Sequence, residues 1–401
     1  MPNEQKIDIS GRAFDWMKGS AGELVSALGK DTCRFVGGAV RDSLIRKPVQ
    51  DVDLATTLTP EEVIKRLEAA KIKVVPTGLK FGTVTAVFPG RHFEVTTLRH
   101  DVETFGRHAK VAFHDDWRED AARRDFTINA LYLSPDGALY DYFGGGDDLT
   151  RGRVRFIGDA AKRIEEDALR ILRLFRFHAW YGQGPLDRDA LEAVGQKLDL
   201  LNILSQQRVA AETFKLLRAP DPLPLLKAME KVGVLAKLFP EFTFNFKRLT
   251  NVVALENALG DVSGLRRLGA FLVVDEPAAK NIATALKLSN RQGKRLLDAV
   301  TNPLPGKVSE KKARAELYLH REQAFRDRLI LRGGAVADIK ALLDYAGGYE
   351  IPKFPVQGAD LKKRGVKPGV EMGKILDGLE ARWLKSDFSL SKSELLKLLK
   401  L

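Results

Sequence analysis

The sequence predicts an α+β protein, in which a mixed α/β region over roughly residues 20–150 is followed by a region built only of helices. In the first part, segments rich in β-branched and aromatic residues alternate with helix-start signals. After about Gly158 the strand signals fade, and apolar residues recur at helical spacing to the C-terminus. Because a single core rarely grows beyond about 250–300 residues, the 401-residue chain is expected to form more than one domain.

Local signals predict the elements of the α/β region in order. A strand over 34–36 leads into Gly37-Gly38, and a helix over 40–45 follows. Thr59, Pro60 and Glu62 predict a capped helix start, and this helix is expected to end near residue 70. The charged stretch 99–120 is expected to be a mobile loop. Further strands are expected at 72–75, 83–88 and 93–98, and in a hairpin at 131–133 and 139–142.

The helical region is expected to contain helices over 160–180, 188–198 and 207–217, with Pro/Gly clusters between later helices. Lys and Arg outnumber Asp and Glu by 65 to 53, a net charge of +12, which favours a polyanionic partner and nucleic acid first. The single cysteine, Cys33, excludes an intramolecular disulfide and a Cys-based zinc site. No apolar run of about 18 residues and no signal core occur, so no membrane partner and a cytoplasmic location are expected.

The most informative motif is Val36–Asp42 followed by Asp51-Val52-Asp53. A glycine pair lets backbone N–H groups approach a phosphate, and Arg41 can fork onto phosphate oxygens. Asp51 and Asp53, two residues apart on an extended segment, project from one face and supply the oxygen ligands that Mg²⁺ prefers. A chance meeting of a glycine turn with an acidic loop is the alternative for either half alone. Their order and closeness favour metal-dependent phosphoryl or nucleotidyl transfer.

A second block, Arg123-Arg124-Asp125 before a hydrophobic strand, suits contacts to a triphosphate and a ribose, although two arginines could also form a solvated edge. A third block places Asp167, Arg170, Arg173 and Arg176 at i, i+3 steps on an expected helix. Spacing alone favours an intrahelical ion pair with exposed cations. A functional alternative is base recognition, because an Asp acceptor beside an Arg donor matches the pairing edges of cytosine and adenine and clashes with guanine and uracil.

These three blocks, in this order, resemble the motifs of the class II CCA-adding enzymes, within the bacterial tRNA nucleotidyltransferase and poly(A) polymerase family. Weaker similarity continues through 201–209, and 358–369 also resembles the family's helical C-terminus. The resemblance implies a polymerase-β-like nucleotidyltransferase head at 1–150 and a helical neck at 151–220 that carries the base-selecting helix. It further implies a helical body at 221–330 and a tRNA-binding tail at 331–401.

The resemblance also implies roles for individual residues. Asp51 and Asp53 would be catalytic and hold Mg²⁺, and Glu94 is an open candidate for a third carboxylate that activates the attacking hydroxyl. Asp167 and Arg170 would read the base edge. The stretch 98–108 resembles the flexible loop that assists the switch from C to A. The full set of expected nucleotide-binding residues is Gly38, Arg41, Arg124, Asp167, Arg170, Arg173 and Arg176.

The activity that the resemblance implies is template-independent addition of CMP, CMP and AMP to the 3′ end of tRNA, with CTP and ATP as substrates. A poly(A) polymerase or an A-only tRNA-adding enzyme shares the head motifs and is the main alternative. A catalytically silent RNA-binding protein is disfavoured by the intact Asp51/Asp53 pair. A small-molecule nucleotidyltransferase would not explain the long basic helical region.

Overall fold

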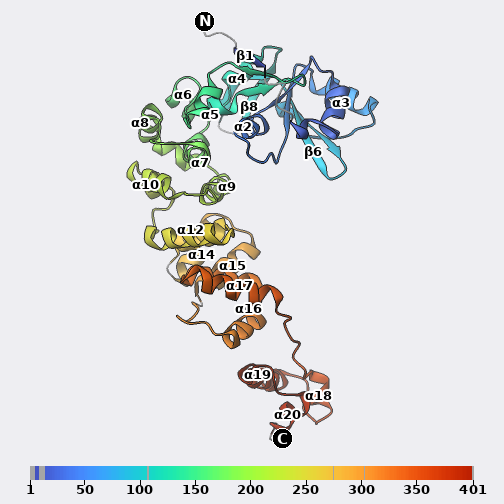
Figure 1. Cartoon of the computed structure of the whole chain (residues 1–401), viewed down its shortest axis with the longest axis vertical. Helices are drawn as coiled ribbons and strands as arrows, with labels where there is room; N and C mark the ends of the chain where they lie inside the picture. The colour runs from blue at the N-terminus through green and yellow to red at the C-terminus, as the bar shows by residue number, and fades with distance from the viewer. Residues whose placement is uncertain (1–4, 9–13, 106–107, 274, 302, 400–401) are drawn as a thin grey trace. The chain divides into compact units, whose positions relative to one another are not determined.

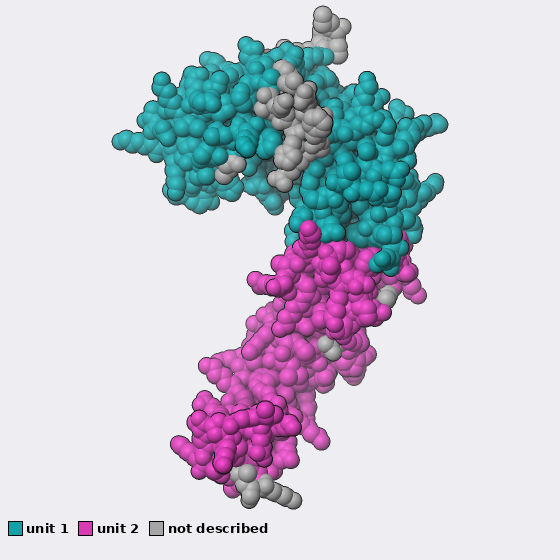
Figure 2. Space-filling model, turned by 180° about the vertical axis from the view of Figure 1, so that it is seen from behind, with its two compact units in different colours: residues 1–241 teal, residues 242–401 magenta. Residues whose placement is uncertain are grey.

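The computed structural model describes residues 5–8, 14–105, 108–273, 275–301 and 303–399. The chain divides into two units, residues 1–241 and 242–401 (Figure 2). The first unit holds the sheets and a set of helices, and the second is helical (Figure 1). In the described part of the chain, no helix is both long enough and apolar enough to cross a membrane.

An eight-stranded mixed sheet forms the centre of the first unit, with the strand order β1-β10-β9-β2-β3-β6-β5-β4. Strands β3 and β6 pair in parallel, and the other pairings that the structure describes in this sheet are antiparallel. The hairpin expected around residues 134–137 is confirmed, because β9 and β10 pair antiparallel. The strands are β1 (Gln5–Asp8), β2 (Cys33–Val36), β3 (Asp53–Thr56), β4 (Lys73–Gly78), β5 (Thr83–Phe88), β6 (Arg91–Thr97), β9 (Leu131–Leu133) and β10 (Ala138–Asp141).

The register of the central strands brings the chemically important residues to one place. Asp53, the first residue of β3, lies opposite Val36 of β2 on one side and Glu94 of β6 on the other. Val36 is followed by the glycine pair, and helix α2 (Gly38–Leu44) begins at Gly38. The glycine turn and the Asp53 carboxylate therefore meet at the same end of β2 and β3.

Helices pack around the sheet and continue beyond it in the first unit. Helix α3 begins as expected, because the Thr59 hydroxyl accepts a hydrogen bond from the Glu62 amide at 3.3 Å. The α-helices are α1 (Ser20–Leu28), α3 (Pro60–Ala69), α4 (Trp117–Ala122), α5 (Gly145–Thr150), α6 (Ala160–Glu166), α7 (Leu169–Tyr181), α8 (Arg188–Gln196), α9 (Gln206–Leu217), α10 (Leu223–Lys231) and α11 (Val234–Leu238). Short 3-10 helices lie at η1 (Asp15–Met17), η2 (Leu79–Phe81), η3 (Thr127–Asn129) and η4 (Leu198–Ile203).

Two sequence-based expectations in this unit are wrong. The stretch expected to be a loop forms a two-stranded antiparallel ribbon, β7 (Arg99–Phe105) with β8 (His108–Phe113), and then α4. Gly106 and Arg107, part of the expected flexible loop, lie outside the described residues. The single helix expected over 160–180 is two helices, α6 and α7, because Asp167 between them is extended, with φ −152° and ψ 105°.

The second unit is organised around helix α13 (Gly264–Leu272), all of whose residues are buried. Its two arginines are fully buried and are neutralised from neighbouring helices: Arg266 pairs with Glu256 at 2.6 Å and with Asp327 at 3.0 Å. Helix α16 is kinked at Arg321, where φ is +68°. The other helices are α12 (Phe246–Leu259), α14 (Glu276–Ala285), α15 (Asn290–Thr301), α16 (Glu310–Arg332), α17 (Val336–Gly348), α18 (Gly358–Lys362), α19 (Val370–Lys385) and α20 (Lys392–Lys397).

Candidate active site

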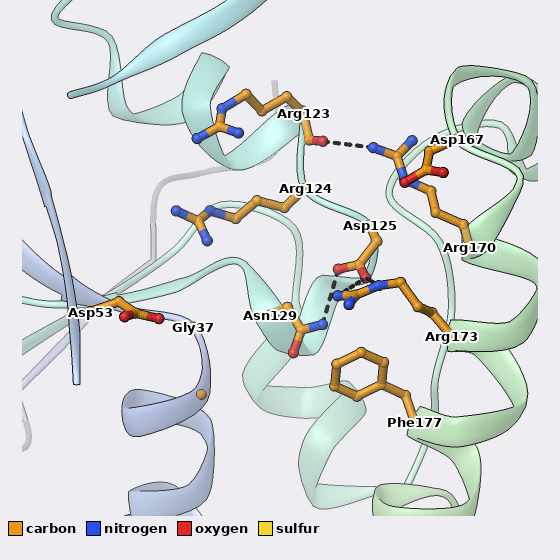
Figure 3. Close-up of a pocket in the computed structure, with 11 residues that line it drawn as sticks. Gly37, Asp53, Arg123, Arg124, Asp125, Asn129, Asp167, Arg170, Arg173 and Phe177 are labelled. Atoms are coloured by element: carbon orange, nitrogen blue, oxygen red, sulfur yellow. Dashed lines mark hydrogen bonds and ion pairs between the residues drawn. The ribbon is translucent and has the colours of Figure 1, made fainter. Parts of the chain in front are cut away.

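A pocket of about 370 Å³ lies in the first unit where the glycine turn, strand β3, the segment after α4 and the start of α7 meet (Figure 3). Four arginines, three aspartates, an amide and an aromatic ring line it together with the two glycines. The lining residues are Gly37, Gly38, Asp53, Arg123, Arg124, Asp125, Asn129, Asp167, Arg170, Arg173 and Phe177.

The glycine turn brings main chain to the pocket wall. Gly37 has φ +70° and ψ −124°, a conformation that L side chains rarely adopt, and it caps the N-terminus of α2. A Cβ built on Gly37 would lie 3.9 Å from Nη1 of Arg124. A bound anion can therefore meet both main-chain N–H groups and a guanidinium here.

Carboxylates gather on the β3 side of the pocket. Burial raises the pKa of Asp53 to about 6, helped by Glu94 and Asp51 and opposed by Arg124. A divalent cation would relieve this repulsion, so the residues present fit one. Asp51 itself is exposed and does not line the pocket. No group of three or more His, Cys, Asp or Glu side chains arranged for a metal occurs among the described residues.

Arg124 is fixed by a buried network behind the pocket. Its Nη2 donates to Asp120 at 3.1 Å and its Nε to the Tyr132 hydroxyl at 3.1 Å, and that hydroxyl donates to Asp120 at 2.6 Å. Although burial opposes them, Arg124 and Arg123 hold the pKa of Asp120 well below its usual range. Arg124 therefore stays charged and oriented.

A second chain of hydrogen bonds joins Asp125 to two helices. Arg173 of α7 donates to one Asp125 oxygen at 2.6 Å, and the Asn129 amide donates to the other at 2.9 Å (Figure 3). The Asn129 oxygen accepts from Nη1 of Arg41 at 2.5 Å, and Nη2 of Arg41 donates to the Tyr181 hydroxyl at 2.7 Å. Arg41 therefore lies behind the pocket and is engaged with protein partners.

Asp167 and Arg170 both line the pocket, and their side chains are bound to different partners. One Asp167 oxygen accepts from the Leu169 amide at 3.1 Å and the other from Nη2 of Arg208 at 2.7 Å. The expectation of a helical row starting at Asp167 is wrong, since the residue lies before α7. Arg170 pairs with Glu166, and its Nη2 donates to the Arg123 carbonyl at 3.2 Å.

The pocket brings together six of the nine site residues expected from the sequence: Gly38, Asp53, Arg124, Asp167, Arg170 and Arg173. Arg41, Asp51 and Arg176 do not line it. Arg176 pairs with Glu212 and lies 4.0 Å from the Phe177 ring centroid. Sequence reasoning did not single out Asn129, Phe177 or Arg208. Asn129 comes shortly after the Arg123-Arg124-Asp125 block, Phe177 directly follows Arg176 of the third block, and Arg208 lies in the segment of weaker resemblance.

Two family models match the first unit. The model described as the poly(A) polymerase head domain matches residues 33–155. The model described as a probable RNA and SrmB binding site of polymerase A matches residues 185–245. Every lining residue up to Asn129 falls within the first match.

Relatives match nearly the whole chain. The mitochondrial CCA tRNA nucleotidyltransferase 1 of Danio rerio is 35% identical over 91% of this chain and 86% of its own length. The CCA-adding enzyme of Limosilactobacillus fermentum is 33% identical over 90% and 91%. The crystal structure of the Bacillus stearothermophilus CCA-adding enzyme in complex with CTP superposes with a TM-score of 0.70 at 26% identity, over 95% of this chain and 98% of that one. With a nucleotidyltransferase head on a mixed sheet, a helical remainder and relatives at this identity and coverage, the chain belongs to the CCA tRNA nucleotidyltransferase family.

Proposed function

We propose that the pocket is the active site of a template-independent tRNA nucleotidyltransferase, which adds CMP, CMP and AMP to the 3′ end of tRNA from CTP and ATP. The observation that carries this proposal is that groups suited to a triphosphate, a metal and a base lie together in one pocket. A glycine turn at a helix start and Arg124 suit a triphosphate, and Asp53 suits a metal. Asp167 and Arg170 suit the edge of a base.

Enzymes of this family generally depend on a divalent metal, and we propose Mg²⁺ held by Asp51 and Asp53. The raised pKa of Asp53 supports a cation at this place, because burial and the nearby Glu94 and Asp51 disfavour its negative charge more than Arg124 favours it. Bound Mg²⁺ would supply charge neutralisation at the triphosphate during displacement of pyrophosphate. Glu94, opposite Asp53 in the register, is proposed as the acceptor of the proton from the attacking 3′ hydroxyl.

The nucleotide is proposed to lie across the pocket, with its phosphates toward Gly38 and Arg124 and its base toward α7. There the Asp167 carboxylate would accept from the exocyclic amine of cytosine or adenine, and Arg170 would donate to the neighbouring ring nitrogen. Arg41 would act on the triphosphate together with Gly38, and Arg173 and Arg176 would support the base or the phosphates. Uracil and guanine present a carbonyl where Asp167 needs a donor, so UTP and GTP would be rejected.

Poly(A) polymerase activity, the main alternative, has no observation in its favour. The two matching models carry poly(A) polymerase descriptions, but they cover only residues 33–155 and 185–245. The relatives that match about nine-tenths of the chain bear CCA-adding names. We also propose the four-part division into a head at 1–150, a neck at 151–220, a body at 221–330 and a tRNA-binding tail at 331–401. The cytoplasm remains our proposed location, although the vertebrate relatives are named mitochondrial.

The deciding experiment gives the purified protein a tRNA that lacks its last three nucleotides, with Mg²⁺ and both triphosphates. We expect addition of C, C and A and then a stop. With ATP alone the same substrate should gain little, whereas a tRNA ending in CC should be completed. Long adenylate tails on an unstructured RNA, without CMP incorporation into the truncated tRNA, would establish the polymerase alternative instead.

A further inference from the structure

An aromatic ring at the C-terminal end of α7 contacts helix α2 and the residues that follow it. Tyr181, the last residue of α7, accepts a hydrogen bond from Nη2 of Arg41 at 2.7 Å, and its ring centroid lies 4.1 Å from the guanidinium carbon. Lys47, just after α2, donates to the Trp180 carbonyl at 2.7 Å, and its Nζ lies 4.5 Å from the Tyr181 centroid. One ring therefore contacts two cations that belong to α2 and its continuation.

These contacts lead directly to the pocket. Arg41 is buried, and its Nη1 donates to Asn129, which lines the pocket. A Cβ built on Gly38, also in the pocket wall, would lie 3.7 Å from Nη2 of Arg41, the atom that donates to Tyr181. Asn129 in turn donates to Asp125, which accepts from Arg173 two turns before Tyr181 on α7. The hydrogen bonds thus form a closed circuit from α7 through Asp125, Asn129 and Arg41 back to α7.

We propose that Tyr181 is a positioning residue, which acts through Arg41 to hold the first turn of α2 in register with α7. Resting on the proposed function, this contact would align the triphosphate site at Gly38 with the base site on α7. Burial, with Asp42 adding to it and Arg41 opposing, raises the pKa of Tyr181 to about 12. The hydroxyl therefore stays neutral at physiological pH, and the contact persists. A misplacement of about 1 Å between reacting groups can cost about a hundredfold in rate, so a loosened α2 should be visible in catalysis.

The test compares Tyr181→Phe with a matched control, Tyr142→Phe. Tyr142 is a buried tyrosine of the same unit whose hydroxyl accepts from Nη1 of Arg34 at 2.8 Å, and it does not line the pocket. Each variant loses an arginine–tyrosine hydrogen bond and keeps the ring, and Tyr181→Phe also removes the hydrogen bond of the hydroxyl with Asp42. We expect Tyr181→Phe to lower kcat for CMP incorporation by about tenfold while KM for CTP changes by less than about twofold. Tyr142→Phe should keep wild-type kcat, and hydrogen exchange in α2 should accelerate only in Tyr181→Phe.

A double-variant cycle tests whether Tyr181 acts through Arg41. If it does, Arg41→Lys combined with Tyr181→Phe should have the kcat of Arg41→Lys alone. Multiplicative losses, or wild-type kcat and wild-type α2 exchange in Tyr181→Phe, would overturn the proposal. If the wild-type protein incorporates no nucleotide, the proposed function fails, and the exchange rates of the α2 amides in Tyr181→Phe and Tyr142→Phe decide the positioning role by themselves.

Discussion

Arg208 should govern base choice although it does not line the pocket. Its Nη2 donates to Asp167 at 2.7 Å, and both side chains are about three-quarters buried, with 25% and 23% exposed. We expect Arg208→Met to free the carboxylate that faces the base, because methionine keeps an apolar stem and loses the donor. The Leu169 amide would still hold the other Asp167 oxygen at 3.1 Å, so the carboxylate would be loosened rather than removed.

The size of the effect follows from the contact that is lost. A hydrogen bond to a charged group contributes about 1.5–3 kcal/mol. A good base-edge contact gives about 1–3 kcal/mol of discrimination, which is the most that Asp167 can lose. Because the Leu169 amide still holds Asp167, we expect a loss of discrimination near the lower end of this range. About 1.4 kcal/mol corresponds to a tenfold change. Preference for CTP over UTP should therefore fall by about tenfold.

The assay is single-nucleotide incorporation into a truncated tRNA, with kcat/KM measured separately for CTP and UTP. Arg218→Met is the matched control, because this exposed arginine ends the same helix, α9, and does not line the pocket. An equal loss for CTP and UTP in Arg208→Met would mean that Arg208 supports only the fold. Wild-type kcat/KM for both nucleotides in Arg208→Met would mean that the Arg208 contact has no effect on base choice.

Two further predictions concern carboxylates with shifted pKa values. Asp53→Asn should abolish nucleotide addition without lowering the melting temperature, because the raised pKa of Asp53 shows that its charge is unfavourable in the folded protein; a melting temperature several degrees lower would contradict this. Asp120 and Asp125 have lowered pKa values, so their stabilisation is complete above the ordinary Asp pKa of about 3.9 and is lost as the pH falls below it. The melting temperature, measured from pH 7 to pH 3, should therefore fall more steeply below about pH 4. This fall should be smaller in Asp120→Asn.

Elements with strong local signals could be predicted from the sequence. Strand β5 has the bounds 83–88 that alternation of β-branched residues predicts, and the Thr59 cap forms as its spacing requires. The glycine turn and Asp53 meet because the neighbouring ends of β2 and β3 meet, which a sequence motif can encode, and the segment after α4 adds Arg124. The fold class followed from the strand and helix signals along the chain and the family from the order of the motifs, and the comparisons confirm both.

The errors arise where tertiary contacts override local pattern. The helical periodicity runs unbroken through 160–180, with no proline or glycine at Asp167 to signal an end. The break is accompanied by contacts from Leu169 and from Arg208, 41 positions away, and no local pattern contains the second. The β7–β8 ribbon was not predicted, because charged residues alternate there with β-branched and aromatic ones. This pattern is compatible both with a loop and with exposed strands.

Three arginines of the pocket are each paired with a carboxylate, which explains how a cluster of cations can be stable without substrate. Arg124 is held by Asp120, Arg173 by Asp125 and Arg170 by Glu166. Despite burial, nearby Tyr132 and Asp120 raise the pKa of Arg124, and Asp125 raises that of Arg173. Arg124 and Arg173 are thus charged, and all three guanidinium groups are fixed in direction before a nucleotide arrives. Because such donors need no reorganisation during the reaction, they stabilise developing negative charge more strongly than mobile surface arginines would.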